Sequence, residues 1–312
     1  MDALAGLLDG PRAKGAFLIR SRMRPPWSVE IRDRAPLSIQ VMTSGTSFVT
    51  TVDGEVRELR EGDIAVMRGP DPYTVADDHA SPAQWLIHPD QRCTTLDGTP
   101  VHDTLDFGVR SWGNDPEGPT GMLIGTYRVD NEVSRRVLTN LPGLLVVTAA
   151  ELDSPIPALL GAEITRDAPG QDVVLDRLLD LLLIAVLRAW FSGTDAPAWY
   201  RAWGDPVVGR AMRLMHTDVA RPWTVANLAA ETGVSRATLA RRFTELAGEP
   251  PMTFLADLRL TLAADRLREP EATVQAVARE VGYGSPFALS TAFKRARGMS
   301  PREFRSRATA MA

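Results

Sequence analysis

The spacing of hydrophobic and polar positions changes near residue 150, from the alternation typical of strands to the period of helices. Between residues 16 and 130, short apolar segments are separated by turn residues such as Gly45, the DG pair at 53–54 and the RGPDP stretch at 68–72. Regularly spaced short strands of this kind predict an antiparallel β-barrel or sandwich. The expected strands are LSIQVM, SFVTTV, VREL, DIAVM, YTVAD, QWLIH and GMLIGTYRV.

A helical region follows at residues 154–192. Its stretch VVLDRLLDLLLIAVLRAWF is apolar on more faces than a lone surface helix leaves exposed. The most apolar run, residues 178–191, is shorter than a membrane span and carries two charged residues. We therefore expect a buried or interface helix, with Leu182 and Leu183 in a symmetric contact between two copies of the chain. Packing onto the β-region alone is the alternative.

The C-terminal third contains an internal repeat. The segment TVANLAAETGVSRATLARRFTELAGEPPMTF (224–254) matches TVQAVAREVGYGSPFALSTAFKRARGMSPREF (273–304). Matching residues are 49 positions apart before the central turn and 50 apart after it. The two copies therefore differ by one residue, which is inserted in the turn of the second copy.

Each copy has the pattern of a helix-turn-helix. Thr224 or Thr273 can cap a helix start, and about two turns with apolar inward positions follow. Gly233 or Gly282 then permits the left-handed backbone that ends a helix, and a serine begins a second helix. The segment between the copies, residues 251–269, predicts one long amphipathic helix that fixes their separation. Its expected buried face consists of Phe254, Leu255, Leu258, Leu262 and Leu267.

The basic residues are concentrated in the C-terminal third, which also contains the repeat. The whole sequence has 35 basic and 39 acidic residues and a formal net charge of −4. Residues 205–312 hold 16 basic and 11 acidic residues, a net of +5, so residues 1–204 hold the other 19 basic and 28 acidic residues, a net of −9. A basic segment on an acidic body favours a polyanion partner for that segment alone.

The two helix pairs, the linking helix and the stretch VGYGSPFALSTAFKRARGMSPREFR resemble the DNA-binding domain of the AraC/XylS family of transcription regulators. The resemblance covers residues 205–312, with helix-turn-helix motifs at 224–246 and 273–296. It implies that the second helix of each pair enters the major groove of DNA.

The resemblance also implies which side chains meet DNA. In the first motif they are Ser235, Arg236, Ala237, Ala240, Arg241 and Arg242. Arg241 is able to read a guanine there, and Arg236 and Arg242 meet phosphates. In the second motif the base-facing positions are Pro286, Phe287, Ala288 and Thr291, and Lys294, Arg295 and Arg297 are phosphate contacts. Phe287 departs from the more usual polar residues and suggests contact with a thymine methyl group, weaker sequence readout or partial burial.

The β-region resembles the cupin sensor domain of one AraC subgroup, on its strand order and the stretch GDIAVMRG. A metal-binding cupin has two histidines spaced by one residue, a carboxylate and a later histidine. This chain has no H-x-H, Tyr73 stands near one such histidine position, and the histidines are scattered at His79, His88, His102 and His216. We therefore expect no metal, no cofactor and no catalytic residue. A metal site built from His79, His88 and His102 is the alternative.

Cys93 is the one cysteine of the chain, which excludes an intrachain disulfide and suits a reducing compartment. The neighbouring Arg92 could lower the pKa of this thiol, as a redox sensor needs. No second cysteine is present to resolve a sulfenic acid, so we expect an incidental thiol. The N-terminal sequence shows no secretory signal, and a cytoplasmic, nucleoid-associated protein is expected.

These features predict an α+β protein of three parts. They are a cupin-like antiparallel β-barrel sensor domain (1–150), a helical dimerisation and linker region (151–204) with a packed hinge at 193–206, and an all-α AraC-type DNA-binding domain (205–312). The predicted function is sequence-specific transcription regulation. Its partners are promoter or operator double-stranded DNA, an unknown small-molecule effector, a second copy of the chain and, as a further candidate, RNA polymerase, but no membrane. The alternatives are a cupin metalloenzyme fused to a DNA-binding module, a redox sensor acting through Cys93, and an N-terminal domain that only oligomerises.

Overall fold

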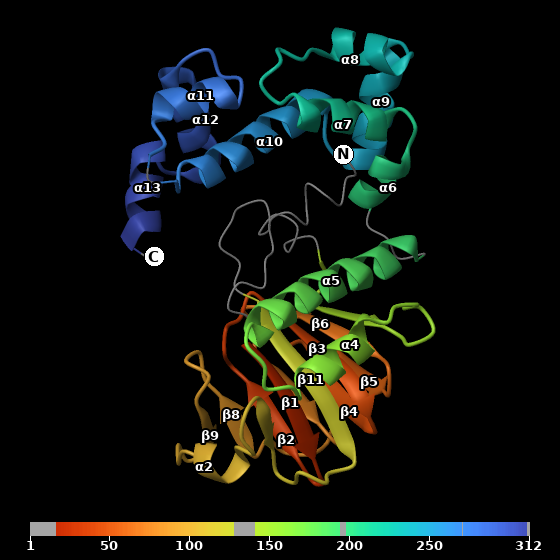
Figure 1. Ribbon diagram of the computed structural model, residues 1–312. Coiled ribbons are helices and arrows are strands. Elements are labelled where there is room, and N and C mark those ends of the chain that lie inside the picture. The colour runs from red at the N-terminus through yellow and green to blue at the C-terminus, as the bar shows by residue number, and fades with distance from the viewer. Residues whose placement is uncertain (1–16, 128–140, 194–197, 270, 311–312) are drawn as a thin grey trace. The chain divides into compact units, whose positions relative to one another are not determined.

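The chain folds into two compact units (Figure 1). The computed structural model describes residues 17–127, 141–193, 198–269 and 271–310. Residues 17–127 and 141–193 form a β-rich unit, and residues 198–269 and 271–310 form a helical unit. Of the expected hinge at 193–206, Trp203 is buried in the helical unit, whereas the side chains of Trp199 and Tyr200 lie outside the described residues.

Two six-stranded sheets form the β-rich unit. Their strand orders are β10-β1-β11-β3-β6-β12 and β5-β4-β7-β2-β8-β9. Among the described strands, β1 with β10 and β2 with β8 are parallel pairs and the other pairs are antiparallel. The prediction of an antiparallel barrel or sandwich is confirmed as a two-sheet sandwich. The strands are β1 Phe17–Met23, β2 Ser28–Ile31, β3 Leu37–Ser44, β4 Thr46–Thr51, β5 Val56–Arg60, β6 Ile64–Arg68, β7 Tyr73–Ala76, β8 Trp85–Ile87, β9 Cys93–Thr95, β10 Ser111–Gly113, β11 Thr120–Tyr127 and β12 Leu144–Val147, with the short helix α2 His102–Leu105 between β9 and β10.

Strand β11 is buried on both faces. Met122 packs into the sandwich core. On the opposite face lies helix α5 (Gln171–Ser192), so close that a Cβ atom on Gly125 would stand 2.8 Å from Leu179 Cδ2. Tyr127 Oη donates a hydrogen bond to Leu179 O at 2.8 Å. Figure 1 shows α5 and the shorter α4 (Ile156–Glu163) over the sheet of β11, β3 and β6. The two helices therefore belong to the core of this unit.

Helix α5 buries one face against the sheet of its own chain. Leu182 is fully buried and Leu183 is 2% exposed. The expectation that these two leucines form a contact between copies is wrong, because their apolar surface is already covered within the unit. A different face of α5 stays open, with Val174 and Leu181 both more than 40% exposed. No helix in the described ranges is long and apolar enough to cross a membrane.

Both expected helix pairs are present in the helical unit. They are formed by α8 with α9 and by α11 with α12, and α10 links them. Thr224 and Asn227 form a reciprocal capping box at the start of α8, and Thr273 caps α11. Gly233 and Gly282 have φ angles of 74° and 80°, and the inserted residue lies between Gly282 and Ser285. The helices are α6 Ala198–Gly204, α7 Val208–Thr217, α8 Val225–Thr232, α9 Arg236–Ala247, α10 Pro251–Arg266, α11 Val274–Glu280, α12 Pro286–Arg297 and α13 Pro301–Ala310.

Two hydrophobic clusters stabilise the helical unit, one around each pair. Leu239 and Phe243 anchor α9 in the first, and Leu289 and Phe293 anchor α12 in the second. Helix α10 contributes to both clusters, and its Leu262 packs against each of them. The predicted linking helix is therefore confirmed. The α10 residues in the first cluster are Leu255 and Leu258, and those in the second are Leu260, Ala263 and Ala264.

Candidate nucleic-acid interface and internal cavity

One face of α9 is buried and the opposite face is open. Ser235 Oγ accepts the backbone N–H of Thr238 at 3.1 Å and begins the helix. Leu239 and Phe243, one turn apart, are fully buried. The helical period then leaves the other side to solvent, where Arg236, Ala237 and Arg241 are exposed and Ala240 is half-buried.

Arg241 forms an ion pair within the helix. Its Nη1 donates to both carboxylate oxygens of Glu245, at 2.8 and 2.9 Å. The Arg241 side chain nevertheless remains 67% exposed. Ion pairs on such an open surface contribute little to stability, so the guanidinium can exchange Glu245 for another acceptor.

The guanidinium of Arg242 forms an ion pair with Asp205, which precedes helix α7. Its Nη2 and Nε donate to Asp205 Oδ2 at 2.6 and 3.0 Å, and Asp205 Oδ1 accepts the N–H groups of Val207 and Val208. Burial alone would raise the pKa of Asp205, but these backbone hydrogen bonds and Arg242 hold it below its ordinary value. Arg242 therefore ties α9 to the start of α7, which the sequence did not suggest.

Helix α12 repeats the plan of α9 with a different outer face. Ser285 Oγ accepts the Ala288 N–H at 3.1 Å, and Leu289 and Phe293 are fully buried. Phe287 is 81% exposed. Lys294 and Arg295 lie in the last turn, where positive charge also matches the helix dipole. Of the seven expected residues, Arg297 is half-buried and the other six are exposed on the open side of this helix: Pro286, Phe287, Ala288, Thr291, Lys294 and Arg295.

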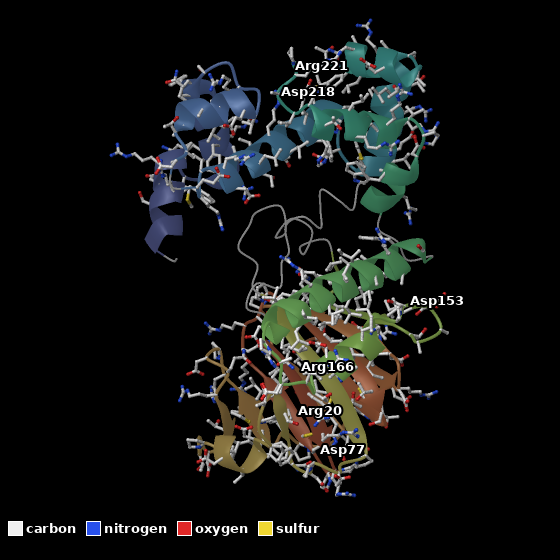
Figure 2. All side chains as sticks on the ribbon, in the orientation of Figure 1. Arg20, Asp77, Asp153, Arg166, Asp218 and Arg221 are labelled. Atoms are coloured by element: carbon white, nitrogen blue, oxygen red, sulfur yellow. The ribbon has the colours of Figure 1, made fainter. Side chains whose placement is uncertain are left out.

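Arg259 of α10 connects the two helix pairs. Its Nε and Nη2 donate to the carbonyls of Val219 and Arg221 at 2.9 and 2.8 Å. Those carbonyls belong to the loop between α7 and α8, where Figure 2 labels Asp218 and Arg221. The corner of the second pair touches the same loop, because a Cβ on Gly282 would lie 2.7 Å from Ala220 O and from Arg259 Nη2. The burial of Arg259 lowers its pKa.

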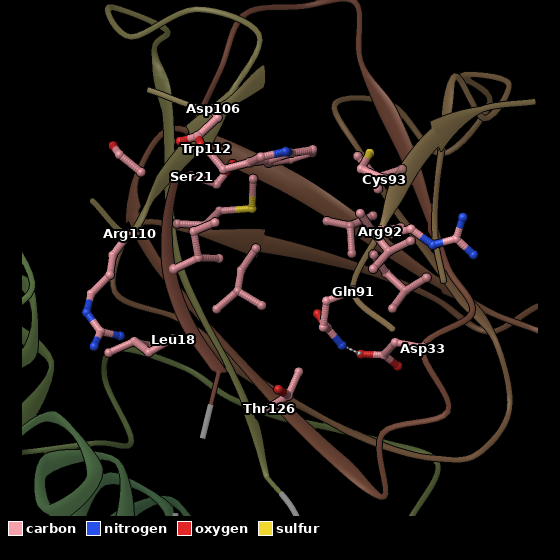
Figure 3. A pocket seen from close by; sticks show the side chains of 18 of the residues that line it. Leu18, Ser21, Asp33, Gln91, Arg92, Cys93, Asp106, Arg110, Trp112 and Thr126 are labelled. Carbon is pink, nitrogen blue, oxygen red and sulfur yellow. Dashed lines mark hydrogen bonds between the residues drawn. The ribbon is translucent and has the colours of Figure 1, made fainter. Parts of the chain in front are cut away.

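The β-rich unit encloses a cavity of about 800 Å³ between its two sheets (Figure 3). Ile19, Trp112 and Ile124 line it from one sheet and Ile31, Tyr73 and Ile87 from the other. Helix α5 contributes Leu175 and Asp176 to the lining. A mostly apolar cavity of this size, with a few polar groups, is typical of sites for small molecules.

The polar side chains that line the cavity form several separate groups and not one cluster. Gln91 Nε2 donates to Asp33 Oδ2 at 3.4 Å on the side opposite Arg110 (Figure 3). Arg110 is paired with Asp172 of α5, and Arg92 with Asp90. Ser21 Oγ is buried and has no hydrogen-bond partner among the described residues.

The histidines do not converge. His79 is exposed beside Asp78, and His88 Nε2 lies 2.9 Å from Thr94 Oγ1. His216 packs between the rings of Trp203 and Phe254 in the helical unit, and the side chain of His102 lies outside the described residues. In the described part of the chain, no group of three or more His, Cys, Asp or Glu side chains could hold a metal ion.

Tyr73, which stands near one histidine position of a metal-binding cupin, lines the cavity. Burial and the nearby Asp33 raise the pKa of its phenol.

Cys93 lies in the cavity wall and is 5% exposed. Burial raises the pKa of its thiol to about 11. The guanidinium of Arg92, which the redox-sensor alternative needs to lower this pKa, is paired with Asp90 instead. The thiolate is the reactive form of cysteine, so this environment disfavours a redox-sensing thiol.

No effector-binding residue could be named from the sequence, although Tyr73, Arg92 and Cys93, which were considered for other roles, line the cavity. One available signal was the alternation in FLIRSRM, which brings Ile19, Ser21 and Met23 to the same side of β1. Asp33 and Gln91 carried no signal, because they follow different strands and meet only through the fold.

Comparison with known proteins agrees with this architecture. A family model described as Cupin matches residues 2–192, and one described as Helix-turn-helix domain matches residues 228–307. An AraC-like transcription regulator of Streptomyces antibioticus is 34% identical over 89% of this chain and 90% of its own. Another, of Streptomyces lividans, is 32% identical over 91% of each chain.

Among solved structures, the DNA-binding domain of AdpA, the global transcriptional factor, in complex with a target DNA is also similar. It is 32% identical, with a TM-score of 0.33, and the match covers 34% of this chain and 96% of that one. The relatives are transcription regulators and not enzymes. The matches of residues 2–192 and 228–307, together with the two full-length relatives, show that this chain is a DNA-binding transcription regulator of the AraC family with an N-terminal cupin domain.

Proposed function

We propose that this regulator reads a specific operator through α9 and α12, and that a small molecule bound in the β-rich unit controls this reading. The observation that supports the proposal is the burial pattern that α9 and α12 share. Each buries a leucine and a phenylalanine and leaves its opposite face open. Selection of binding sites from random duplex DNA, followed by footprinting, tests it: a single preferred sequence with two protected major-groove segments is expected.

The open side chains of the two helices differ in chemistry. Arg241, on the open face of α9, can make two directed hydrogen bonds to a guanine, the commonest specific contact. Arg236, Lys294 and Arg295 take part in no ion pair among the described residues and are candidates for phosphate contacts. We assign Arg242 a positioning role instead, because Asp205 holds its guanidinium. Pro286, Phe287 and Ala288 offer no side-chain donors, which leaves Thr291 as the main polar reader of α12.

Arg241→Ala should weaken binding to the selected operator by roughly 1–3 kcal/mol and relax the preference at one base pair. Fluorescence anisotropy with every single-base variant of the operator measures both effects. Lys294→Ala is the matched control and should weaken binding to all sequences alike, with a salt dependence flatter by about one unit of slope. Equal losses of specific and non-specific binding in Arg241→Ala would contradict the assignment.

The cavity supports control by a small molecule because it reaches helix α5. Leu175 and Asp176 line it directly, and Arg110 in its wall is paired with Asp172 at the start of α5. A ligand there would contact both sheets and α5 together. The redox alternative through Cys93 is less well supported, since burial raises the pKa of that thiol.

A dimer formed through α5 is part of the proposal. The open face of α5 carries Val174, Leu178, Leu181 and Ala185, with the spacing of four, three and four residues that marks a helix–helix seam. Val174 is 45% and Leu181 is 49% exposed. A second copy of the chain is the occupant that we propose, because the same stripe on two copies can pair about a two-fold axis.

Leu181→Glu should convert the dimer into a folded monomer, whereas Leu182→Glu should destabilise the β-rich unit itself. The two leucines are neighbours in sequence, but Leu182 is fully buried and Leu181 is half-exposed. Sedimentation velocity measures the oligomeric state and circular dichroism checks the fold. Wild-type protein that sediments as a monomer at micromolar concentration would contradict the proposed dimer.

A further inference from the structure

Asp33 is a carboxylate of the cavity wall with only neutral donors. It follows strand β2 and is half-buried. Its Oδ1 accepts the Ala35 N–H at 3.0 Å, and its Oδ2 accepts Gln91 Nε2 at 3.4 Å. No cationic side chain of the described residues pairs with it. A carboxylate forms its strongest hydrogen bonds with charged donors, so Asp33 retains the capacity for a cation.

The charge of the lining favours a cationic ligand over an anionic one. Five aspartates and two arginines line the cavity, which gives the lining a net formal charge of −3. Both arginines are already paired with aspartates, Arg92 with Asp90 and Arg110 with Asp172. A cation therefore meets a lining with a net negative formal charge, in which the carboxylate of Asp33 is paired with no guanidinium of the described residues.

The rest of the cavity suits an apolar body. Trp112 and Ile124 face it from one sheet and Ile31 and Tyr73 from the other. Burial raises the pKa of the Tyr73 phenol, and the charge of the nearby Asp33 carboxylate raises it further. An aromatic ring beside a carboxylate can stabilise a cation through its π face as well.

We propose that the cavity binds a hydrophobic amine, whose ammonium group pairs with Asp33 and whose apolar body packs between the two sheets. This inference rests on the proposed function, since it names the chemical class of the small molecule that the β-rich unit would take. It excludes fatty acids and other carboxylates as preferred ligands.

Three probes with the same two-ring body test the head group: 1-naphthylmethylamine, 1-naphthylmethanol and 1-naphthoic acid. Isothermal titration calorimetry of the full chain at neutral pH should give the affinity order amine, alcohol, acid. The amine should bind about 10- to 100-fold more tightly than the alcohol, the range of one charge-assisted hydrogen bond. Equal affinities for amine and alcohol, or a preference for the acid, would overturn the proposal.

Three variants, one of them a control, assign the effect to the site. Asp33→Asn keeps an acceptor for the Ala35 N–H and should reduce the affinity for the amine to that for the alcohol, with little change for the alcohol. Asp71→Asn, an exposed aspartate that does not line the cavity, is the matched control and should bind all probes like wild type. Ile124→Trp should fill the cavity and abolish binding of both the amine and the alcohol. Wild-type selectivity in Asp33→Asn would refute the pairing.

DNA binding measured on the same preparations separates the two hypotheses. If the protein binds its operator but shows no preference for the amine, this inference fails and the DNA-reading part of the proposed function stands. If the amine binds through Asp33 but leaves the operator affinity unchanged, the inference stands and control of DNA binding from the cavity fails.

Discussion

Replacing Gly282 with alanine should destabilise the second helix-turn-helix by roughly 2–4 kcal/mol, and with it operator binding. Two independent penalties act at this corner. The backbone has a φ angle of +80°, which side chains other than glycine rarely adopt. In addition, the new Cβ would lie 2.7 Å from the carbonyl oxygen of Ala220, in the loop that Arg259 holds. The loop would have to move away from α10 to admit the methyl group.

Two other glycines separate these penalties. Gly233 has a φ of +74° at the equivalent corner but nothing within 4 Å of a Cβ, so Gly233→Ala should cost only the backbone strain, about 1–2 kcal/mol. Gly284 has neither feature, and Gly284→Ala should be nearly neutral. Hydrogen exchange of peptides from α8–α9 and α11–α12 in the full chain reports each corner separately. Equal effects of Gly282→Ala and Gly233→Ala would show that the contact with Ala220 is unimportant.

The helix pairs could be predicted from the sequence because their determinants are local. Thr224 and Thr273 cap helices, Gly233 and Gly282 end them, and the repeat supplies each signal twice. The same holds for the apolar anchors of α9 and α12, whose spacing of four residues assigns the buried face. The open faces lie opposite these anchors, and the resemblance to the AraC/XylS family then implied which of their residues face DNA.

Contacts between distant segments could not be predicted. Arg242 has the sequence context of a surface arginine, and only the fold brings it to Asp205, 37 residues away. In α5 every position from 181 to 187 is apolar, so the pattern could not tell Leu181 from Leu182. Strand β1 was missed because Arg20 and Arg22 interrupt its apolar residues. The fold gives them partners, since Arg20 reaches Ser111 and Arg22 reaches Ser44 and the Gly118 carbonyl.

The two hydrophobic clusters of the helical unit should differ in how they respond to the loss of one phenyl ring. Phe243 and Phe293 occupy equivalent positions of the repeat, and both are fully buried. Each also packs edge-on against a second phenylalanine, Phe254 at 5.6 Å and Phe304 at 5.4 Å between ring centroids. Replacement of either by alanine should therefore cost about 3–5 kcal/mol.

The extent of unfolding should be unequal, because the cluster around Phe293 has nine buried members among the described residues and the cluster around Phe243 has thirteen. A smaller core has less stability to lose before its helices open. Phe293→Ala should release α11 and α12 to hydrogen exchange while α8 and α9 stay protected, and the protein should retain only the DNA contacts of α9. Phe243→Ala should raise exchange in both pairs, because α10 begins in the first cluster and carries the second. The control for each variant is Phe287→Ala, which removes an exposed ring and should leave exchange unchanged throughout. If Phe293→Ala exposed α8 and α9 as much as α12, the two pairs would form a single cooperative unit, and the linking helix would transmit every loss from one pair to the other.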